Sequence, residues 1–321
     1  KAGEFCKDFQ LIAVYSRTID RAKKYATHHD AKYVFDNLEE LARCDEVDAV
    51  YVASPNYCHA QHSILMMNHG KHILCEKPVA SNEQELEKML AAAEKNQVVF
   101  LEAVRQIYMP GFQAIKENLE KIGKIRRVTF SYCKYSSRYD NFKRGIIENA
   151  FRPELSNGAL MDIGVYGVHM LGAIFGMPKQ MQSACIKLSN GVDAEGTILA
   201  EYDGMLAEVM YSKVSSLNLP AQIQGEEGTM LIEQLTDPVK IRMIFRDGSE
   251  TVTEIPEEEP AMVYEIRTFT ELIKNEAVRH VYLENSRTEM RITDEVRRQQ
   301  GIVFPADEMQ KPEKEGKRDG R

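Results

Sequence analysis

The sequence lacks several features that would point to common classes of site and partner. Its six cysteines stand at positions 6, 44, 58, 75, 133 and 185, and no two have the C-x-x-C spacing of zinc or thiol-redox sites. No apolar run approaches the roughly 18 residues of a membrane-spanning helix, and the first residues do not resemble a signal peptide. The formal net charge of −8 implies no basic face. These absences predict a cytoplasmic protein with reduced cysteines, no metal site, and neither nucleic acid nor a membrane as partner.

The first third of the chain has the pattern of a parallel α/β sheet. With 321 residues, 43% hydrophobic and 28% charged, the chain has the size and composition of an ordinary globular protein of two domains. Strands are predicted at 11–15, 49–53, 72–75 and 98–101, and helices at 18–28, 37–43, 58–69 and 81–94. Strands that alternate with helices at this spacing indicate βαβ units.

The pattern changes after residue 105. Strands are predicted at 124–135, 181–188, 195–202, 205–213, 220–224, 229–233 and 240–245, and helices at 111–119, 159–175, 263–273 and 286–300. Short turns such as Asp203-Gly204 favour hairpins and an antiparallel meander. Val209 and Leu231 are expected to face the covering helices, with the other face open. We therefore predict an α/β protein: a Rossmann-type domain (1–105), an α+β domain with a large, mainly antiparallel open sheet (106–305), and a charged tail (306–321).

A dinucleotide-binding fold normally begins with a strand and a G-x-G-x-x-G loop, and this chain has neither at its start. We expect both to lie upstream of residue 1 in a longer protein; the alternative is a truncated chain that truly lacks them. The strand at 11–15 then corresponds to the second strand of such a fold, where an acidic residue binds the ribose 2′-hydroxyl. Ser16 and Arg17 stand there instead and suit a 2′-phosphate. The alternative for Arg17 is a solvated loop cation.

Two further stretches carry polar residues at informative places. Ser54-Pro55-Asn56 follows the strand at 49–53, and His59 begins the next helix; Asn56 as a helix cap and His59 as a surface residue are the alternatives. Glu76-Lys77-Pro78 follows the strand at 72–75, at the edge where such sheets bind ligands. A solvated lysine is the alternative for Lys77.

The helix predicted at 159–175 carries a polar stripe. Asp162, Tyr166 and His169 are spaced i, i+4 and i+7, so they share one helix face. Polar groups on an otherwise apolar helix are costly to bury without partners, which favours a functional face. Asp162 can also be a first-turn acid that favours the helix dipole, and His169 a satisfied core histidine. A lysine from one half and an aspartate and tyrosine from the other form a plausible proton-transfer set.

Together these motifs resemble the Gfo/Idh/MocA oxidoreductases, and among them the subgroup of dimeric dihydrodiol dehydrogenase and NADP-dependent xylose dehydrogenase. The resemblance runs from about Leu11 to Pro305 and rests on the Ser54-Pro55-Asn56, Glu76-Lys77-Pro78 and Gly158–Tyr166 stretches. One departure is Leu155-Ser156-Asn157-Gly158, which replaces the family's leucine and three glycines. Bulkier side chains there would narrow or reshape the substrate pocket.

The resemblance implies roles for individual residues. Lys77, Tyr166 and Asp162 match the catalytic set, with Tyr166 as the acid–base. The cofactor, NADP with NAD as an alternative, is expected to contact Ser16, Arg17, Ser54, Pro55, Asn56, His59, Glu76 and Lys77. Arg105, Arg152 and His169 are further candidates for substrate contacts.

The sequence therefore predicts a dehydrogenase acting on CH–OH groups, which transfers a hydride between NADP(H) and a small sugar, polyol or diol. A homodimer through the second domain is expected. Two rival classes are a non-catalytic NAD(P)-binding sensor on the same scaffold and a purely structural interaction protein. The lysine, aspartate and tyrosine together favour catalysis, and the polar helix stripe argues against a structural role.

Overall fold

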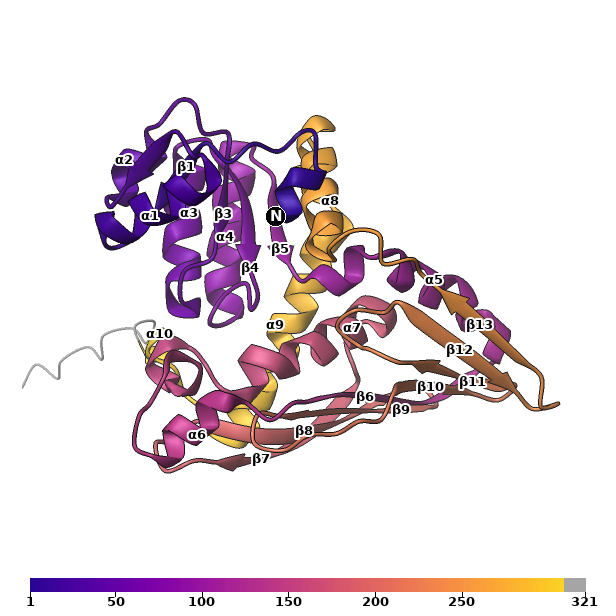
Figure 1. The fold of residues 1–321 in the computed structure, drawn as a ribbon. Coiled ribbons are helices and arrows are strands. Elements are labelled where there is room, and N and C mark those ends of the chain that lie inside the picture. The colour runs from indigo at the N-terminus through magenta and orange to yellow at the C-terminus, as the bar shows by residue number, and fades with distance from the viewer. Residues whose placement is uncertain (309–321) are drawn as a thin grey trace, which may run out of the picture.

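A computed structural model describes residues 1–308 of the chain. The N-terminal part contains five short parallel strands in two sheets, ordered β1-β2 and β3-β4-β5 (Figure 1). The strands are β1 (Ala13–Tyr15), β2 (Tyr33–Phe35), β3 (Ala49–Val52), β4 (His72–Glu76) and β5 (Phe100–Ala103). The helices that alternate with them are α1 (Ile19–His29), α2 (Leu38–Ala42), α3 (His59–Asn68) and α4 (Glu83–Asn96). The predicted parallel βαβ architecture is confirmed.

The sheet β3-β4-β5 is covered on both faces. Ile73 of β4 packs in the core shared with α3 and α4, whereas Leu74 packs in a second cluster with Val263 and Phe269. The last two residues belong to α8 (Met262–Lys274), a helix from the far end of the chain. The sequence prediction placed this helix in the second domain, but its amphipathic face packs on the first.

The C-terminal part is built on one eight-stranded sheet, ordered β13-β12-β11-β10-β6-β9-β8-β7. Its strands are β6 (Ile125–Cys133), β7 (Gln180–Lys187), β8 (Asp193–Tyr202), β9 (Met205–Ser212), β10 (Ala221–Gly225), β11 (Gly228–Ile232), β12 (Lys240–Phe245) and β13 (Glu250–Glu254). Its helices include α5 (Pro110–Asn118), α6 (Ser137–Lys143), α7 (Val165–Phe175), α9 (Val281–Gln300) and α10 (Pro305–Glu308). The sheet is mainly antiparallel, as predicted, but β6 lies between β9 and β10 and pairs in parallel with β9. The simple meander is therefore wrong.

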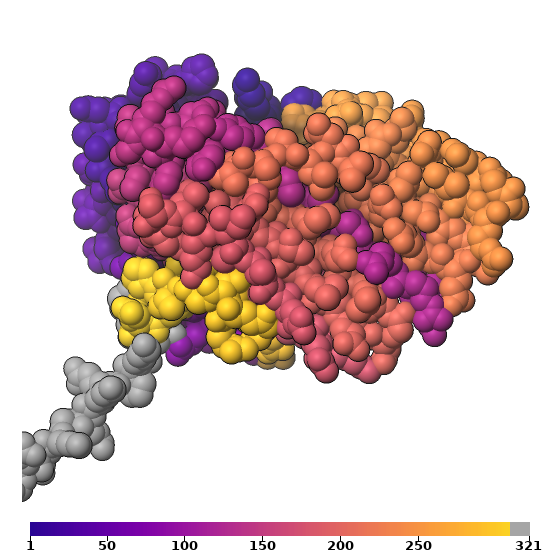
Figure 2. Space-filling view, turned by 90° about the horizontal axis from the view of Figure 1, so that it is seen from below, coloured from indigo at the N-terminus to yellow at the C-terminus, as the bar shows by residue number. Residues whose placement is uncertain are grey.

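One face of this sheet is covered by α7 and α9, and no helix of the described part of the chain covers the middle of the other face (Figure 1). Val209 is buried against Gly167 of α7, as expected. Leu231 is only half-buried, and its neighbour Met230 takes the inward position, so the expectation for Leu231 was one residue out of register. Figure 2 looks onto the open face from below.

The chain remains folded beyond the boundary predicted for the tail. In α10, the Asp307 carboxylate accepts hydrogen bonds from Asn82 (2.8 Å) and from Arg297 (2.7 Å). The prediction that a charged tail starts at residue 306 is therefore wrong, because 305–308 form α10. The remaining residues of the predicted tail, 309–321, lie outside the described part. Among the helices of residues 1–308, none combines the length and apolar character needed to cross a membrane.

Candidate active site

Lys77 lies directly after β4, at the carboxyl edge of the parallel sheet, and its side chain reaches across to the C-terminal part. Its Nζ donates to the backbone carbonyl of Asp162 at 2.6 Å and lies 3.4 Å from the carboxylate Oδ1 of the same residue. Only 14% of the Lys77 side chain is exposed. The solvated alternative for Lys77 is therefore excluded.

Asp162 lies in a single π-helical turn, Leu160–Gly164, that leads into α7. The start of this turn is fixed by Asp193, whose Oδ2 accepts a hydrogen bond from the backbone amide of Leu160 at 2.6 Å. A Cβ at Gly158 would lie 1.9 Å from Oδ1 of Asp193, which explains the glycine there. Burial of Asp193 raises its pKa to about 6. π-Helical turns occur frequently at functional sites.

Tyr166 lies in the first turn of α7 and is 8% exposed. The Nζ of Lys77 is 4.8 Å from the centre of its ring. The ring meets Tyr132 of β6 edge-on, with centroids 5.7 Å apart, and the Arg105 guanidinium lies 5.7 Å from its centre. Arg105 is held by two hydrogen bonds to the Asp237 carboxylate, at 2.9 and 2.8 Å. The predicted lysine, aspartate and tyrosine thus come together, with Arg105 beside them.

Lys213 is a residue of this site that the sequence analysis missed. It follows β9 directly, is 3% exposed, and its Nζ contacts Oδ2 of Asp162 and, at 3.2 Å, the carbonyl of Ala150. The ammonium also lies 4.8 Å from the centre of the Phe151 ring. The sequence carried a signal for it: alternation along the predicted strand 205–213 puts Lys213 on the same face as buried Val209.

The two lysines and Asp162 influence one another electrostatically. Burial raises the pKa of the Asp162 carboxyl, but Lys77 and Lys213 outweigh it, and the net pKa lies below its usual range. Burial lowers the pKa of Lys77, but Tyr166, Asp162 and Glu76 together outweigh it, so the net pKa is raised. For Lys213, burial prevails over Asp162 and the pKa is lowered. Asp162 is therefore ionised at neutral pH.

The Ser54–His59 stretch joins the loops around the site. The buried His59 ring has Nδ1 2.9 Å from the carbonyl oxygen of Pro78 and Nε2 2.8 Å from that of Ser54, so it is not a surface residue. The Asn56 side chain caps no helix; its Nδ2 donates at 3.0 Å to Ser156 O and to Asn157 Oδ1. Asn56 therefore links the two parts of the chain.

The other predicted cofactor residues lie at the carboxyl ends of the parallel strands. Ser16 and Arg17 follow β1; Arg17 is exposed and forms no ion pair within residues 1–308. Glu76 ends β4 and accepts a hydrogen bond from the hydroxyl of Tyr51. The Ser54 Oγ is buried, and no described residue is its hydrogen-bond partner.

Two of the predicted substrate residues lie elsewhere. Arg152 is exposed and donates to the carbonyl of Ile147 in its own loop at 3.2 Å; no hydrogen bond within the described residues joins it to Lys77 or Tyr166.

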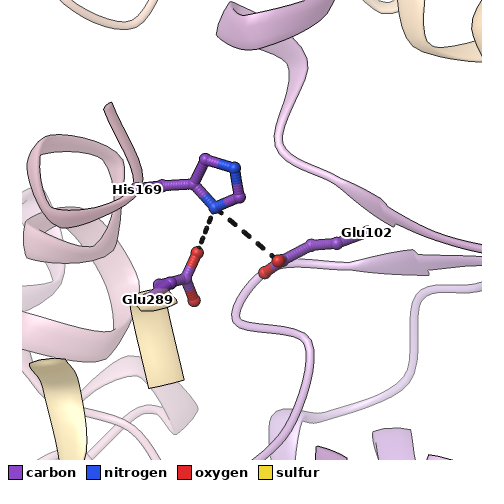
Figure 3. Close-up of side chains that lie close together, drawn as sticks. All are labelled: Glu102, His169 and Glu289. Atoms are coloured by element: carbon purple, nitrogen blue, oxygen red, sulfur yellow. Dashed lines mark hydrogen bonds and ion pairs between the residues drawn. The ribbon is translucent and has the colours of Figure 1, made fainter. Parts of the chain in front are cut away.

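His169 is fully buried and its Nδ1 points to Glu289 and Glu102 (Figure 3). A direct substrate contact by His169 therefore does not agree with the structure. His169 is a core histidine, as its alternative expected, but only its Nδ1 has a partner among the described residues.

The arrangement provides a phenol, an ammonium and an ionised carboxylate at one point between the two parts. A phenol can exchange a proton with a substrate oxygen, and a neighbouring ammonium can polarise that oxygen. Lys77 comes from the carboxyl edge of a parallel sheet, the edge at which such sheets bind ligands.

Comparisons with known proteins show which protein family the chain resembles along most of its length. The model of an oxidoreductase family with an NAD-binding Rossmann fold (Gfo/Idh/MocA) matches residues 2–104, and the model of the Gfo/Idh/MocA C-terminal domain matches residues 112–231. The chain is 48% identical over 305 residues to scyllo-inositol 2-dehydrogenase (NADP(+)) IolU of Bacillus subtilis (strain 168), covering 94% of this chain and 93% of that protein.

More distant proteins match over a similar length. Trans-1,2-dihydrobenzene-1,2-diol dehydrogenase of Danio rerio is 28% identical over 315 residues, covering 93% of this chain and 91% of that protein. A crystal structure of a 3-ketoreductase from Actinomadura kijaniata with NADP and TDP-benzene superimposes with a TM-score of 0.84 at 21% identity, covering 94% of this chain and 93% of that one. The last likeness concerns the fold alone.

Proposed function

The chain belongs to the Gfo/Idh/MocA family of oxidoreductases, and we propose that within it the protein transfers a hydride between NADP(H) and a small polyol, sugar or diol. The proposal rests on one observation: Lys77 of the N-terminal part contacts Asp162 and the ring of Tyr166, which belong to the C-terminal part. Two relatives of the chain, named scyllo-inositol 2-dehydrogenase and trans-1,2-dihydrobenzene-1,2-diol dehydrogenase, support this substrate class.

The residues of the N-terminal part fit a dinucleotide. The buried Ser54 Oγ has no partner among the described residues, and a polar group of the cofactor would satisfy it. Arg17 is exposed at the end of β1, where a guanidinium binds a 2′-phosphate. Glu76 and Lys77 would border the same edge of the sheet. When bound, the nicotinamide supplies the hydride-transfer chemistry.

Side chains of the protein transfer the proton of the substrate hydroxyl. Tyr166 exchanges the proton of the substrate hydroxyl, and the ammonium of Lys77 polarises the same oxygen. Asp162 holds Lys77 through its carbonyl and carboxylate, and Lys213 holds Asp162 from the other side. The Asp162 side chain is 30% exposed, so it can also accept a hydrogen bond from a second hydroxyl of a polyol. Arg105 orients the tyrosine ring.

The decisive experiment is to measure NADP-dependent turnover on a panel of inositols, sugars and diols with the wild type and with Lys77→Ala. The variant should lose about 10²–10⁴-fold in kcat, the range for a lost acid–base participant. Lys88→Ala, an exposed lysine of α4, is the control. Full activity in Lys77→Ala would refute the assignment. Tight NADPH binding without turnover on any substrate would favour the sensor alternative.

We also propose that the protein pairs through the open face of the large sheet. That face carries exposed apolar side chains on four strands: Ile186, Leu199, Leu206 and Val252. Exposed apolar groups gathered on one face indicate an interaction site. The six free thiols agree with the proposed location in the cytoplasm.

A further inference from the structure

Three buried side chains from distant parts of the chain meet in the interior of the protein (Figure 3). Glu102 comes from β5, His169 from α7 and Glu289 from α9, and each is at most 2% exposed. The His169 Nδ1 lies 2.5 Å from Oε2 of Glu289 and 3.7 Å from Oε2 of Glu102. We call this group the Glu–His–Glu cluster. The proton-transfer scheme above does not use it.

We propose that the Glu–His–Glu cluster is a hydrogen-bonded unit that positions Lys77 against Tyr166. On one side, Oε1 of Glu102 accepts a hydrogen bond from the backbone amide of Val79 at 3.0 Å. Val79 is fully buried and stands two residues after Lys77. On the other side, His169 follows Tyr166 by three residues, one turn along the same helix. The cluster therefore holds the backbone behind both proposed catalytic side chains.

The hydrogen-bond pattern of the cluster fixes its protons. Within residues 1–308, the buried Nε2 of His169 has no partner, so the imidazole proton belongs on Nδ1, which faces Glu289. Oε2 of Glu102 accepts from the Ser286 hydroxyl at 2.6 Å. Burial, and then the neighbouring Glu289, raise the pKa of Glu102 to about 8. The neighbouring Glu289 thus favours the protonated form of the Glu102 carboxyl, because two adjacent buried carboxylates are costly to ionise together.

The same three residues have ligand atoms within 4.8 Å of one another, a spacing that also occurs around metal ions. A metal bound at about 2.0–2.2 Å from nitrogen and oxygen ligands keeps those atoms farther apart than a hydrogen bond does. The 2.5 Å contact between His169 and Glu289 is therefore a hydrogen bond. It leaves no space for an ion between these two atoms.

The activity readout of this proposal rests on the proposed function, so the test includes a second readout that needs no turnover. His169→Phe keeps the ring volume and removes the donor, whereas His169→Asn keeps a donor near the position of Nδ1. Val168→Ala shortens a fully buried neighbour on α7 without altering the cluster and is the control for loosened packing. For each variant, kcat, KM and hydrogen exchange at the Val79 amide are measured well below the melting temperature.

His169→Phe should lower kcat by about 10²-fold, the cost of a misplacement of roughly 1 Å, with KM changed much less. The Val79 amide should exchange about tenfold faster, because its acceptor Glu102 is less well held. His169→Asn should restore most of both properties, and Val168→Ala should leave both near wild type. If His169→Phe does not fold, Glu289→Met removes the acceptor of His169 instead and should give the same pattern.

Unchanged kcat and Val79 exchange in His169→Phe, or an equal loss in Val168→Ala, would overturn the proposal. One equivalent of tightly bound divalent metal in the wild type, lost in His169→Phe, would also overturn it in favour of a metal site. A wild type without turnover on any polyol would end the proposed function, and Val79 exchange would still decide the role of the cluster.

Discussion

Lys213 contacts the Asp162 carboxylate on the oxygen that Lys77 does not approach, so one carboxylate lies between two lysines from different halves of the chain. Lys213 is the more deeply buried of the two, with 3% of its side chain exposed against 14% for Lys77. A carboxylate held from both sides in this way has a fixed orientation. We infer that Lys213 holds one oxygen of the Asp162 carboxylate, so that the carboxylate does not turn fully to Lys77.

Lys213→Met is therefore expected to reduce kcat by about 10–10²-fold, because Asp162 would turn fully to Lys77. Loss of one of the two lysines that lower the Asp162 pKa should raise that pKa, so the acidic limb of the pH–rate profile should move to higher pH. Steady-state kinetics over a pH series on both sides of neutrality check both effects.

Two controls accompany this prediction. Lys213→Arg retains the charge and should recover part of the activity. Lys143→Met removes an exposed lysine that pairs with Asp140 and should behave as wild type. A wild-type pH profile in Lys213→Met would contradict the positioning role.

The choice of cofactor depends on Arg17, which is exposed at the end of β1. Arg17→Asp should weaken NADPH binding and strengthen NADH binding, because a carboxylate accepts from a free 2′-hydroxyl and repels a phosphate. Arg21→Asp, a nearby exposed position on α1, changes the same charge and is the matched control. Fluorescence titration with both cofactors measures the ratio of dissociation constants. Equal affinities for NADPH and NADH in the wild type would count against the assignment.

Asp193 makes the stability of the protein depend on pH. Burial raises its pKa from its usual 3.8 to about 6 in the folded state. Since the folded state holds this proton more tightly than the unfolded state, the stabilisation is full below the usual pKa and is lost as pH rises through about 6. The free energy of unfolding should fall by up to about 3 kcal/mol over this range on account of Asp193 alone.

Asp193→Asn removes this dependence, because the amide does not ionise and its oxygen can still accept from the Leu160 amide. Urea unfolding at pH 4 and pH 7 should therefore show a smaller change in the variant than in the wild type (pH values chosen on either side of about 6). Asp203→Asn, in an exposed turn, should keep the wild-type difference. Identical pH dependence in Asp193→Asn and the wild type would disprove the account.

Much of the fold could be predicted because its signals are local. The strand β12 has the bounds 240–245 that were predicted, and the other predicted strands are displaced by a few residues. The strand β2 (Tyr33–Phe35) was missed because three residues are too few to show a period. The position of β6 beside β9 could not be predicted, since pairing between strands far apart in sequence has no local signal.

The site was predictable where a residue follows a strand or lies on a helix stripe, as Lys77, Asp162 and Tyr166 do. His169 shares their stripe, but helical spacing cannot tell which end of a stripe faces the substrate and which faces the core. Its partner Glu289 lies 120 residues away in sequence, and only the folded structure brings the two together. Lys213 is predictable from strand alternation, because it lies two and four residues after the buried Tyr211 and Val209.

The last prediction concerns assembly. Leu199 of β8 and Leu206 of β9 lie on adjacent strands of the open face and are 40% and 38% exposed. If two copies pair through this face, both side chains are buried in the dimer, and a charge there would be desolvated without a partner. Leu199→Glu combined with Leu206→Glu should therefore give a monomer at micromolar protein in light scattering, while the wild type gives a dimer.

The control for this prediction is Leu219→Glu, which also adds a charge in place of an exposed leucine, but in the loop between β9 and β10. It should leave the dimer intact. Because both leucines face away from α7, the folded protomer should persist in the double variant, with unchanged far-ultraviolet circular dichroism. A wild type that is monomeric at these concentrations would refute pairing through the sheet, and a dimer that survives both glutamates would place the interface on another surface.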